Sequence, residues 1–443
     1  MKTSDYINLQ SSHKSVKTAL YLYFFLLIFE GALRRWVLPQ FSGPLLLIRD
    51  PLAVYILIVA WKFRILRLNG YVIVIGFISL LSLYTALLFG HGNIYIALYG
   101  LRITLLHFPL LFVIESLFTK DDLIRVARYM IILCIPMLVL ILFQFFSPQT
   151  AWINKGLGEN VEGAGFSGAL GFYRPPGTFS FTNGLVLFFT TCAAFIYWGI
   201  DYPLRLPKWL IYLSLSCLLL SIPFSISRSL LFGVAITSLL YFFISMRAGM
   251  SFIKISILIS FVVLVYLIFG SSQFLGTGIE VLQKRFELAA ESEGGIQGTF
   301  LNRYLGGIGD ALNASADFPF WGYGIGLGSN FGSQYSTGKM EFLISEGEWG
   351  RVLGEMGFLV GLLFLLTRLK ISLVIIKKSY QAYINANVLP WLMMGNIFIF
   401  LLLGQWAQPT SLGFSVFFGG VTLAAIKVYQ DDVNPAPHNI FQS

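Results

Sequence analysis

Three charged side chains in the C-terminal third of the chain recur at the spacing of a helix: Glu348, Arg351 and Glu355. At about 100° per residue they fall within roughly 60° of one another on one helix face. The apolar run LLFLL follows them, so the pattern predicts a charged helix that enters a membrane. Charges in a spanning helix are costly and seldom face lipid, which favours a polar cavity here. An interfacial salt bridge that fixes the helix end is the alternative.

A carboxylate held beside an arginine could act as a general base, which must reach the proton of an acceptor hydroxyl. Glu348 is the preferred candidate, ahead of Glu341 and Glu346, because the predicted helix holds it rigidly beside Arg351. No Ser-His-Asp or Cys-His arrangement is predicted, since His91 lies in a tight loop without an identifiable partner. Glycines on another face of the helix leave room for the backbone of a neighbouring helix to approach closely. This face carries Gly347, Gly350, Gly354, Gly357 and Gly361.

Arginines in three other segments could bind a phosphate group. Arginine binds phosphate oxygens in a bidentate manner and keeps its charge when partly buried. Arg174 precedes PPGTF, Arg228 lies in SISRSLLF, and Arg303 lies in a long hydrophilic segment. Together they would suit a lipid pyrophosphate. The run GYGIGLGSN could cradle a phosphate through backbone amides, although a turn is the favoured interpretation.

Four further arginines have structural interpretations. Arg34, Arg35 and Arg49 are expected to anchor helix ends to lipid headgroups, with Arg49 paired to Asp50. Arg102 lies inside a predicted helix, where a structural ion pair and a functional role are both open.

Composition identifies the class of protein. Of 443 residues, 56% are hydrophobic and 12% are charged, with a mean hydropathy of +0.76. Soluble domains carry about 25% charged residues, so we predict an all-α polytopic membrane protein with a single transmembrane domain over residues 1–443. The net charge of +9 indicates membrane orientation rather than nucleic-acid binding. The three cysteines and four scattered histidines predict neither a disulfide framework nor a metal site.

Apolar runs long enough to span a bilayer predict twelve transmembrane helices. Basic residues, among them Arg368, Lys370, Lys377 and Lys378, mark every second connection, which predicts that both termini are cytoplasmic. The predicted limits are Thr18–Leu38, Pro44–Lys62, Tyr71–Gly90, Ile94–Leu117, Ile124–Phe146, Phe181–Ile200, Pro207–Pro223, Ser229–Met246, Phe252–Gly270, Gly347–Leu369, Val388–Gln405 and Pro409–Val428.

Two long hydrophilic segments fall on the opposite, extracytoplasmic side: residues 147–180 and residues 271–346. Chemistry there has no access to ATP. The second segment precedes the tenth helix and is expected to contain two helices, one from Phe300 to Ser315 and one amphipathic helix at the surface. The stripe of the amphipathic helix is Ile279, Leu282, Phe286 and Ala289. The stretch DFPFWGYGIGLGSN is predicted to be a loop from its Pro and Gly content.

The order of these motifs resembles the O-antigen ligase and O-antigen polymerase superfamily of bacterial envelope proteins. The matching features are Arg174 before PPGTF, the SRS entry to a helix, NRYL, the segment DFPFWGYGIGLG, and LGEMGFLVG. The resemblance extends from Arg174 to Gly361 and includes the helix count. The segments FEGALRRWVLP and RDPL resemble the exopolysaccharide-polymerase branch.

This resemblance implies a glycosyltransferase in the bacterial cytoplasmic membrane, with its active site on the extracytoplasmic face. It implies an undecaprenyl-diphosphate-linked glycan donor, a glycan acceptor and surrounding membrane lipid, without a metal or nucleotide cofactor. A chain-length regulator is a partner that the sequence leaves open.

The resemblance also assigns residues. Arg174, Arg228 and Arg303 match the arginines of the family that grip the diphosphate, with Tyr304, Arg351 and Glu355 as supporting residues. Many members place a histidine where this chain has Glu348 and its neighbours. Either Glu348 substitutes as the base, or the hydroxyl is activated by positioning and charge stabilisation.

Three functions are therefore weighed. A polymerase of lipid-linked repeat units is the preferred one, and a ligase that transfers a finished glycan is hardly separable from it. A multi-pass solute transporter is the third, although no internal repeat and no matching pair of interrupted helices is visible.

Overall fold

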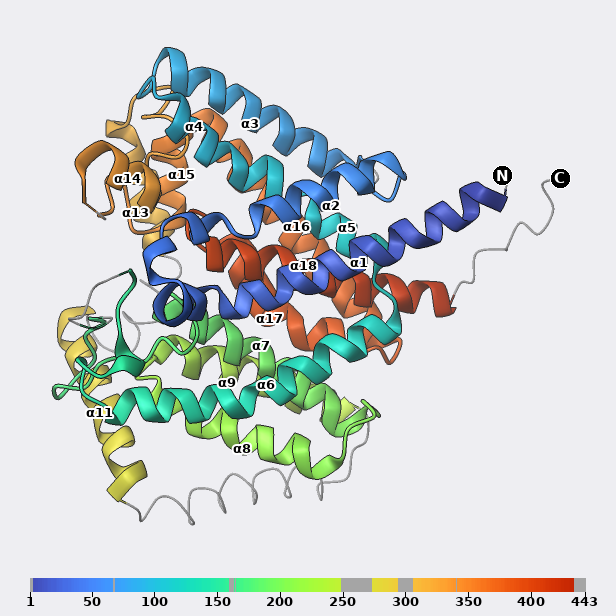
Figure 1. Ribbon diagram of the computed structural model, residues 1–443, viewed down its shortest axis with the longest axis vertical. Helices are drawn as coiled ribbons and strands as arrows, with labels where there is room; N and C mark the ends of the chain where they lie inside the picture. The colour runs from blue at the N-terminus through green and yellow to red at the C-terminus, as the bar shows by residue number, and fades with distance from the viewer. Residues whose placement is uncertain are drawn as a thin grey trace.

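The computed structural model describes residues 3–66, 68–158, 163, 165–247, 273–293, 306–339 and 341–433. Most of these residues are helical, and the extended pairing that they contain is one isolated bridge between Ser167 and Tyr173. The prediction of an all-α fold is confirmed (Figure 1).

The helices follow the predicted apolar runs closely. Nine helical segments of the described part are long and apolar enough to cross a membrane, and α8 and α17 are shorter apolar helices. The predicted span Phe252–Gly270 lies outside the described residues, so the count of twelve stays a prediction. The helices are α1 Thr3–Ala32, α2 Asp50–Lys62, α3 Gly70–Leu88, α4 Ile94–Leu101, α5 Leu110–Leu117, α6 Lys120–Phe146, α7 Thr182–Asp201, α8 Lys208–Phe224, α9 Arg228–Arg247, α11 Gln273–Glu293, α13 Gly307–Ala314, α14 Asn330–Thr337, α15 Glu348–Met356, α16 Phe358–Ile384, α17 Leu389–Leu402 and α18 Pro409–Val433.

The two ends of the bundle differ. Helix α1 begins and α18 finishes at the same end, whereas α11, α13, α14 and α15 gather at the other end (Figure 1). We call this second end the loop end, because both long hydrophilic segments contribute to it. The arrangement agrees with an even number of crossings, and the orientation relative to the cytoplasm stays a prediction.

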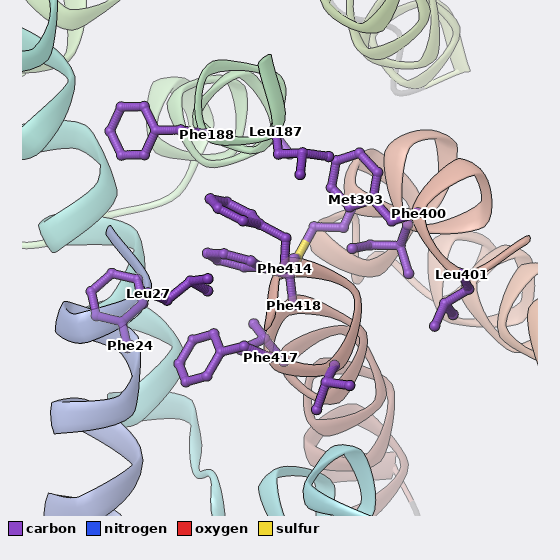
Figure 2. Packing of buried hydrophobic residues seen from close by; sticks show 14 of the residues in the cluster. Phe24, Leu27, Leu187, Phe188, Met393, Phe400, Leu401, Phe414, Phe417 and Phe418 are labelled. Atoms are coloured by element: carbon purple, nitrogen blue, oxygen red, sulfur yellow. The ribbon is translucent and has the colours of Figure 1, made fainter. Parts of the chain in front are cut away.

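Helices α7 and α18 form the centre of the bundle and are buried along most of their lengths. A helix that is apolar on all sides is stable only when neighbours surround it. Figure 2 shows aromatic rings of α18 packed between α1, α7 and α17. The ring of Phe417 stacks on Phe24 of α1 at 5.2 Å between centroids, and Phe414 stacks on Phe418 at 5.3 Å. This rigid core supports the polar groups at the loop end.

The predicted helix Gly347–Leu369 is wrong in two respects. It is broken at Gly357, whose φ of +75° is one that only glycine adopts readily, and a Cβ there would lie 2.1 Å from the carbonyl oxygen of Phe320. Helix α16 then continues to Ile384, because apolar residues recur beyond Leu369. Arg368 is consequently a buried residue inside α16 and not a marker of a basic loop.

The glycine face of α15 receives loop segments of the chain and not the backbone of a neighbouring helix. A Cβ at Gly354 would lie 2.3 Å from a methyl carbon of Ile344, and one at Gly350 would lie 2.5 Å from the hydroxyl oxygen of Ser345. Close approach to these glycines is confirmed, but the part of the chain that approaches them was predicted incorrectly. The connection before α15 folds back on it, which a helix-packing pattern cannot indicate.

The described part of the second hydrophilic segment contains a helix at each of the two predicted places. Helix α11 covers the predicted amphipathic stripe, and α13 occupies the end of the predicted segment Phe300–Ser315. Residues 318–329 are turns, as expected from their Pro and Gly content. Helix α14 was not predicted, because its sequence NFGSQYST lacks an apolar period.

Candidate functional site

A cavity of about 850 Å³ lies at the loop end and reaches between α7, α9, α17 and α18. Three guanidinium groups line it, those of Arg174, Arg228 and Arg285, together with the carboxylates of Glu346 and Glu348. We call it the arginine cavity. These five residues come from four segments that are far apart in the sequence, so only the fold brings them together.

Arg174 is positioned by a small hairpin in the first hydrophilic segment. Its backbone N–H donates to the carbonyl oxygen of Phe166 at 2.8 Å, next to the bridge between Ser167 and Tyr173. Gly168 closes the hairpin, and its N–H donates to Phe172 at 3.1 Å. The guanidinium of Arg174 therefore enters the cavity from a braced loop.

The segment after Arg174, which contains PPGTF, is buried between α1 and α6. The amide of Gln144 holds Gly177 on both sides, accepting from its N–H at 2.9 Å and donating to its carbonyl at 3.2 Å. The hydroxyl of Thr178 donates to the carbonyl of Ile28 at 2.6 Å. Gly31 makes room for this passage, because a Cβ there would lie 2.3 Å from the backbone nitrogen of Ser180. The FEGALRR motif thus holds the PPGTF segment in place.

Arg34 and Arg35 belong to the same contact. Arg34 donates to the hydroxyl of Ser180 at 2.9 Å and to the carbonyl of Ser42 at 2.7 Å, and Arg35 donates to the carbonyl of Gly177 at 3.4 Å. Both side chains are buried. The prediction that they anchor helix ends to headgroups is wrong, because residues 38–49 fold over them.

Arg228 is the first residue of α9 and is 6% exposed. The turn before it contains Ile226 at a φ of 49°, an uncommon backbone conformation for a β-branched residue. The hydroxyl of Ser227 accepts from the N–H of Leu230 at 3.4 Å, at the start of the helix. The partial positive charge of the helix N-terminus adds to the positive charge of Arg228. The side chain of Ile226 also packs where Gly168 has no Cβ, which joins this turn to the hairpin of Arg174.

Arg285 on α11 was not predicted as a site residue. It follows Leu282 by three positions, so it borders the apolar stripe and does not lie opposite to it. Lys284 and Glu287 lie on the exposed part of the helix and pair at 2.9 Å. A cation at the border of an apolar stripe was the signal available in the sequence, and α11 turns that border toward the cavity.

Glu348 lies in the cavity wall and is 4% exposed. Arg351 donates to both of its oxygens, at 2.9 and 3.0 Å. Arg368 donates to Oε1, and the N–H of Trp406 donates to Oε2 at 3.2 Å. Each carboxylate oxygen therefore accepts two hydrogen bonds. The predicted contact between Glu348 and Arg351 is confirmed, whereas the pairing with Arg368 joins residues 20 apart and was not predicted.

Arg351 also binds Glu355 at 2.5 Å, as the spacing of the charges predicted. Burial opposes the charge of Arg351, but the two neighbouring carboxylates outweigh it and raise the pKa of the guanidinium. Burial raises the pKa of Glu355, and Arg351 opposes that rise. The group of Glu348, Arg351, Glu355 and Arg368 is a closed ion-pair network, which we call the α15 network.

The glycine run at residues 322–328 is tied to this network. The N–H of Gly328 donates to the carboxylate of Glu355 at 2.9 Å, and the N–H of Gly324 donates to the Glu355 carbonyl at 3.0 Å. These amides are occupied by the chain, so the run serves as a packed turn and these two do not cradle a phosphate. His91 braces the run: one ring nitrogen lies 3.0 Å from the N–H of Asn93 and the other 3.2 Å from the carbonyl of Ile325.

The remaining predicted residues have separate outcomes. Arg303 and Tyr304 lie outside the described residues, so their roles stay predictions. Arg102 forms an ion pair with Asp50 at 2.6 Å, which was one of its two interpretations. Arg49 pairs with Glu30 at 3.1 Å and not with Asp50, because Arg102 and His107 occupy that carboxylate.

Comparisons with known proteins do not extend this description. The chain matches no family model, and no curated protein and no solved structure is detectably similar to it. The site is therefore interpreted from its own residues and geometry.

Proposed function

We propose that the chain is a membrane glycosyltransferase that joins undecaprenyl-diphosphate-linked oligosaccharide units into a surface polysaccharide. The observation that supports this most is the arginine cavity, in which Arg174, Arg228 and Arg285 surround one volume beside Glu346 and Glu348. Three guanidinium groups suit a diphosphate, because each can donate two parallel hydrogen bonds to its oxygens. The long apolar helices suit a substrate that is itself held in a membrane.

The reaction needs an acceptor hydroxyl oxygen to form a bond with the anomeric carbon of the donor sugar. The bond between that carbon and the diphosphate oxygen breaks, and the diphosphate leaves with the electron pair. The proton of the acceptor hydroxyl passes to a carboxylate of the cavity wall or to the leaving diphosphate. The three arginines stabilise the negative charge that develops on the leaving group. Because the cavity lies at the loop end, we infer that transfer occurs on the extracytoplasmic face of a bacterial cytoplasmic membrane.

Glu348 and Glu346 have different positions in the proposed site. Both oxygens of Glu348 already accept two hydrogen bonds each, so taking a proton from a hydroxyl would displace one of these donors. Glu346 is exposed in the cavity wall and makes no ion pair with another described residue. This geometry favours activation by positioning, with Glu348 holding Arg351 and Arg368 in place.

The substitution Glu348→Gln tests the sequence prediction that Glu348 is the base. A loss of at least about 100-fold in product formation, at unchanged membrane levels, would support the base role. Activity within a few-fold of wild type would support positioning. Glu346→Gln is measured in parallel, and Glu341→Gln is the matched control, because Glu341 is exposed and does not line the arginine cavity.

The function itself is tested with the purified full-length chain in liposomes that contain an undecaprenyl-diphosphate-linked oligosaccharide. We expect a ladder of extended glycans with wild type and none with Arg228→Ala, at equal protein levels. A normal ladder with Arg228→Ala would contradict the assignment. Transfer of glycan only to an added lipid or protein acceptor would indicate a ligase. Movement of a solute without any glycan product would indicate a transporter.

A further inference from the structure

A second cavity of about 530 Å³ adjoins the arginine cavity. We call it the side cavity. Its walls are the end of α1, the turns at residues 42–47, α4, and the starts of α7, α14 and α18. Phe181, Asn183 and Gln408 line both cavities, so the two meet at these residues. A volume of this size holds a small organic ligand.

The aromatic ring of Tyr99 forms one wall of the side cavity. Tyr99 is 6% exposed, and its ring is fixed, with Phe331 stacked at 4.7 Å between centroids and the guanidinium of Arg102 at 4.6 Å from the ring centroid. Its hydroxyl is inaccessible, so the ring and not the hydroxyl faces the cavity. A ligand in the side cavity would therefore meet a flat aromatic face.

The two charged side chains that line the side cavity pair with each other. Glu30 and Arg34 line it and lie 3.5 Å apart, and Glu30 also pairs with Arg49 behind the wall. The other polar lining groups include the amides of Asn183, Asn330, Gln334 and Gln408. Amides both donate and accept hydrogen bonds. Amides, hydroxyls and aromatic rings without excess charge suit a neutral ligand rich in hydroxyl groups.

We propose that the side cavity binds the acceptor sugar. This inference rests on the proposed function, and it assigns the second substrate to its own site. A sugar in the side cavity can present a hydroxyl past Asn183 and Gln408 to the anomeric carbon of a donor whose diphosphate lies in the arginine cavity. The nucleophile then approaches from a different side than the leaving group, as displacement at that carbon requires.

Two probes test the inference with the detergent-purified full-length chain. Saturation-transfer NMR measures the binding of a panel of methyl hexosides and methyl N-acetylhexosaminides, and a titration measures the binding of undecaprenyl diphosphate. We expect at least one glycoside to bind wild type. Asn330→Ala and Gln334→Ala should each raise its Kd about 3- to 10-fold, the effect of one lost hydrogen bond. Ser336→Ala is the matched control, because Ser336 lies on α14 beyond the residues that line the side cavity.

The outcomes separate this inference from the proposed function. It is overturned if no glycoside of the panel binds, or if both variants bind it as wild type does. If Gln334→Ala weakens glycoside binding while Arg228→Ala leaves the affinity for undecaprenyl diphosphate unchanged, the sugar site stands and the diphosphate site fails. If Arg228→Ala weakens binding of undecaprenyl diphosphate and Asn330→Ala and Gln334→Ala change nothing, the sugar site alone fails.

Discussion

Two arginine-rich regions of the molecule place the same residue type in different surroundings. In the arginine cavity, Arg174, Arg228 and Arg285 line an open volume. In the N-terminal cluster, which consists of Glu30, Arg34, Arg49, Asp50 and Arg102, carboxylates and guanidinium groups pair with each other inside the bundle. Arg49 additionally donates to the carbonyl of Pro409 at 2.6 Å. The role of an intramembrane arginine therefore depends on the groups that surround its guanidinium and cannot be inferred from its position in a predicted helix.

The two regions are also connected mechanically. Arg34, Arg35 and Gly31 hold the PPGTF segment, and that segment carries Arg174 toward the arginine cavity. The end of α1 and the turn after it, residues 31–35, therefore support the site without lining the arginine cavity. Substitutions in the N-terminal cluster should mainly lower stability, whereas substitutions in the arginine cavity should mainly lower activity.

The largest expected effect on stability is that of Arg49→Met. Removal of Arg49 leaves the buried carboxylate of Glu30 with Arg34 alone and the carbonyl of Pro409 without this donor. Breaking a buried pair by removing one partner costs about 3–5 kcal/mol in the free energy of unfolding. Thermal unfolding of the purified chain, followed by size-exclusion chromatography, measures the loss.

The matched variant is Arg228→Met in the arginine cavity. We expect it to remove activity while it lowers the free energy of unfolding by much less than Arg49→Met does. Equal losses of stability in the two variants would contradict the proposed difference between the two regions, because both arginines would then be structural.

Gly31→Ala is expected to have the next largest effect. The new Cβ would lie 2.3 to 2.5 Å from backbone atoms of residues 178–180, none of which can rotate away. Overpacking of this kind costs about 1–3 kcal/mol, and it should displace Arg174, so glycan extension should fall more than the amount of folded protein does. Gly70→Ala is the control, since a Cβ at Gly70 meets nothing within 4 Å. Wild-type extension in Gly31→Ala would show that the contact between Gly31 and the PPGTF segment does not support the site.

The smallest effect concerns His91 and pH. Burial lowers the pKa of His91, and the neutral ring braces Asn93 and the glycine run at residues 322–328. The unfolded chain binds a proton more readily, so stability should fall as the pH drops below about 6.5, the ordinary value for histidine. Thermal unfolding at pH 7.5 and 5.5 measures this, and His91→Gln should reduce the difference. An unchanged difference in His91→Gln would mean that other groups cause it.

Features that depend on residues close together in the sequence could be predicted from it. Composition and apolar run length predicted the membrane helices, and the spacing of Glu348, Arg351 and Glu355 predicted their mutual contacts, because three residues on one helix face must be neighbours. Contacts between distant segments could not be predicted in this way. Arg368 and Arg285 reach their places through the packing of α16 and α11, and no periodicity encodes that packing.

The same limit explains the incorrect prediction for the N-terminal arginines. Arg34, Arg35 and Arg49 flank the predicted helix ends, where exposure to headgroups is the usual outcome. The chain instead continues as a short π-helix from Leu33 to Val37 and then folds back through 3-10 turns. Irregular backbone of this kind has no period in the sequence, so its burial of three charges was not predictable.

If arginines from separate segments bind one diphosphate, the loss of any one of them should weaken its binding, and a direct binding measurement tests this most simply. A titration of undecaprenyl diphosphate into the purified chain compares wild type with Arg174→Ala, Arg228→Ala and Arg285→Ala. Arg205→Ala is the control, because the side chain of Arg205 is 76% exposed and does not line the arginine cavity. Each cavity substitution should raise the Kd at least about 10-fold, as expected for lost hydrogen bonds to a charged group, and the control should not. Equal affinities for wild type and all three cavity variants would contradict the account.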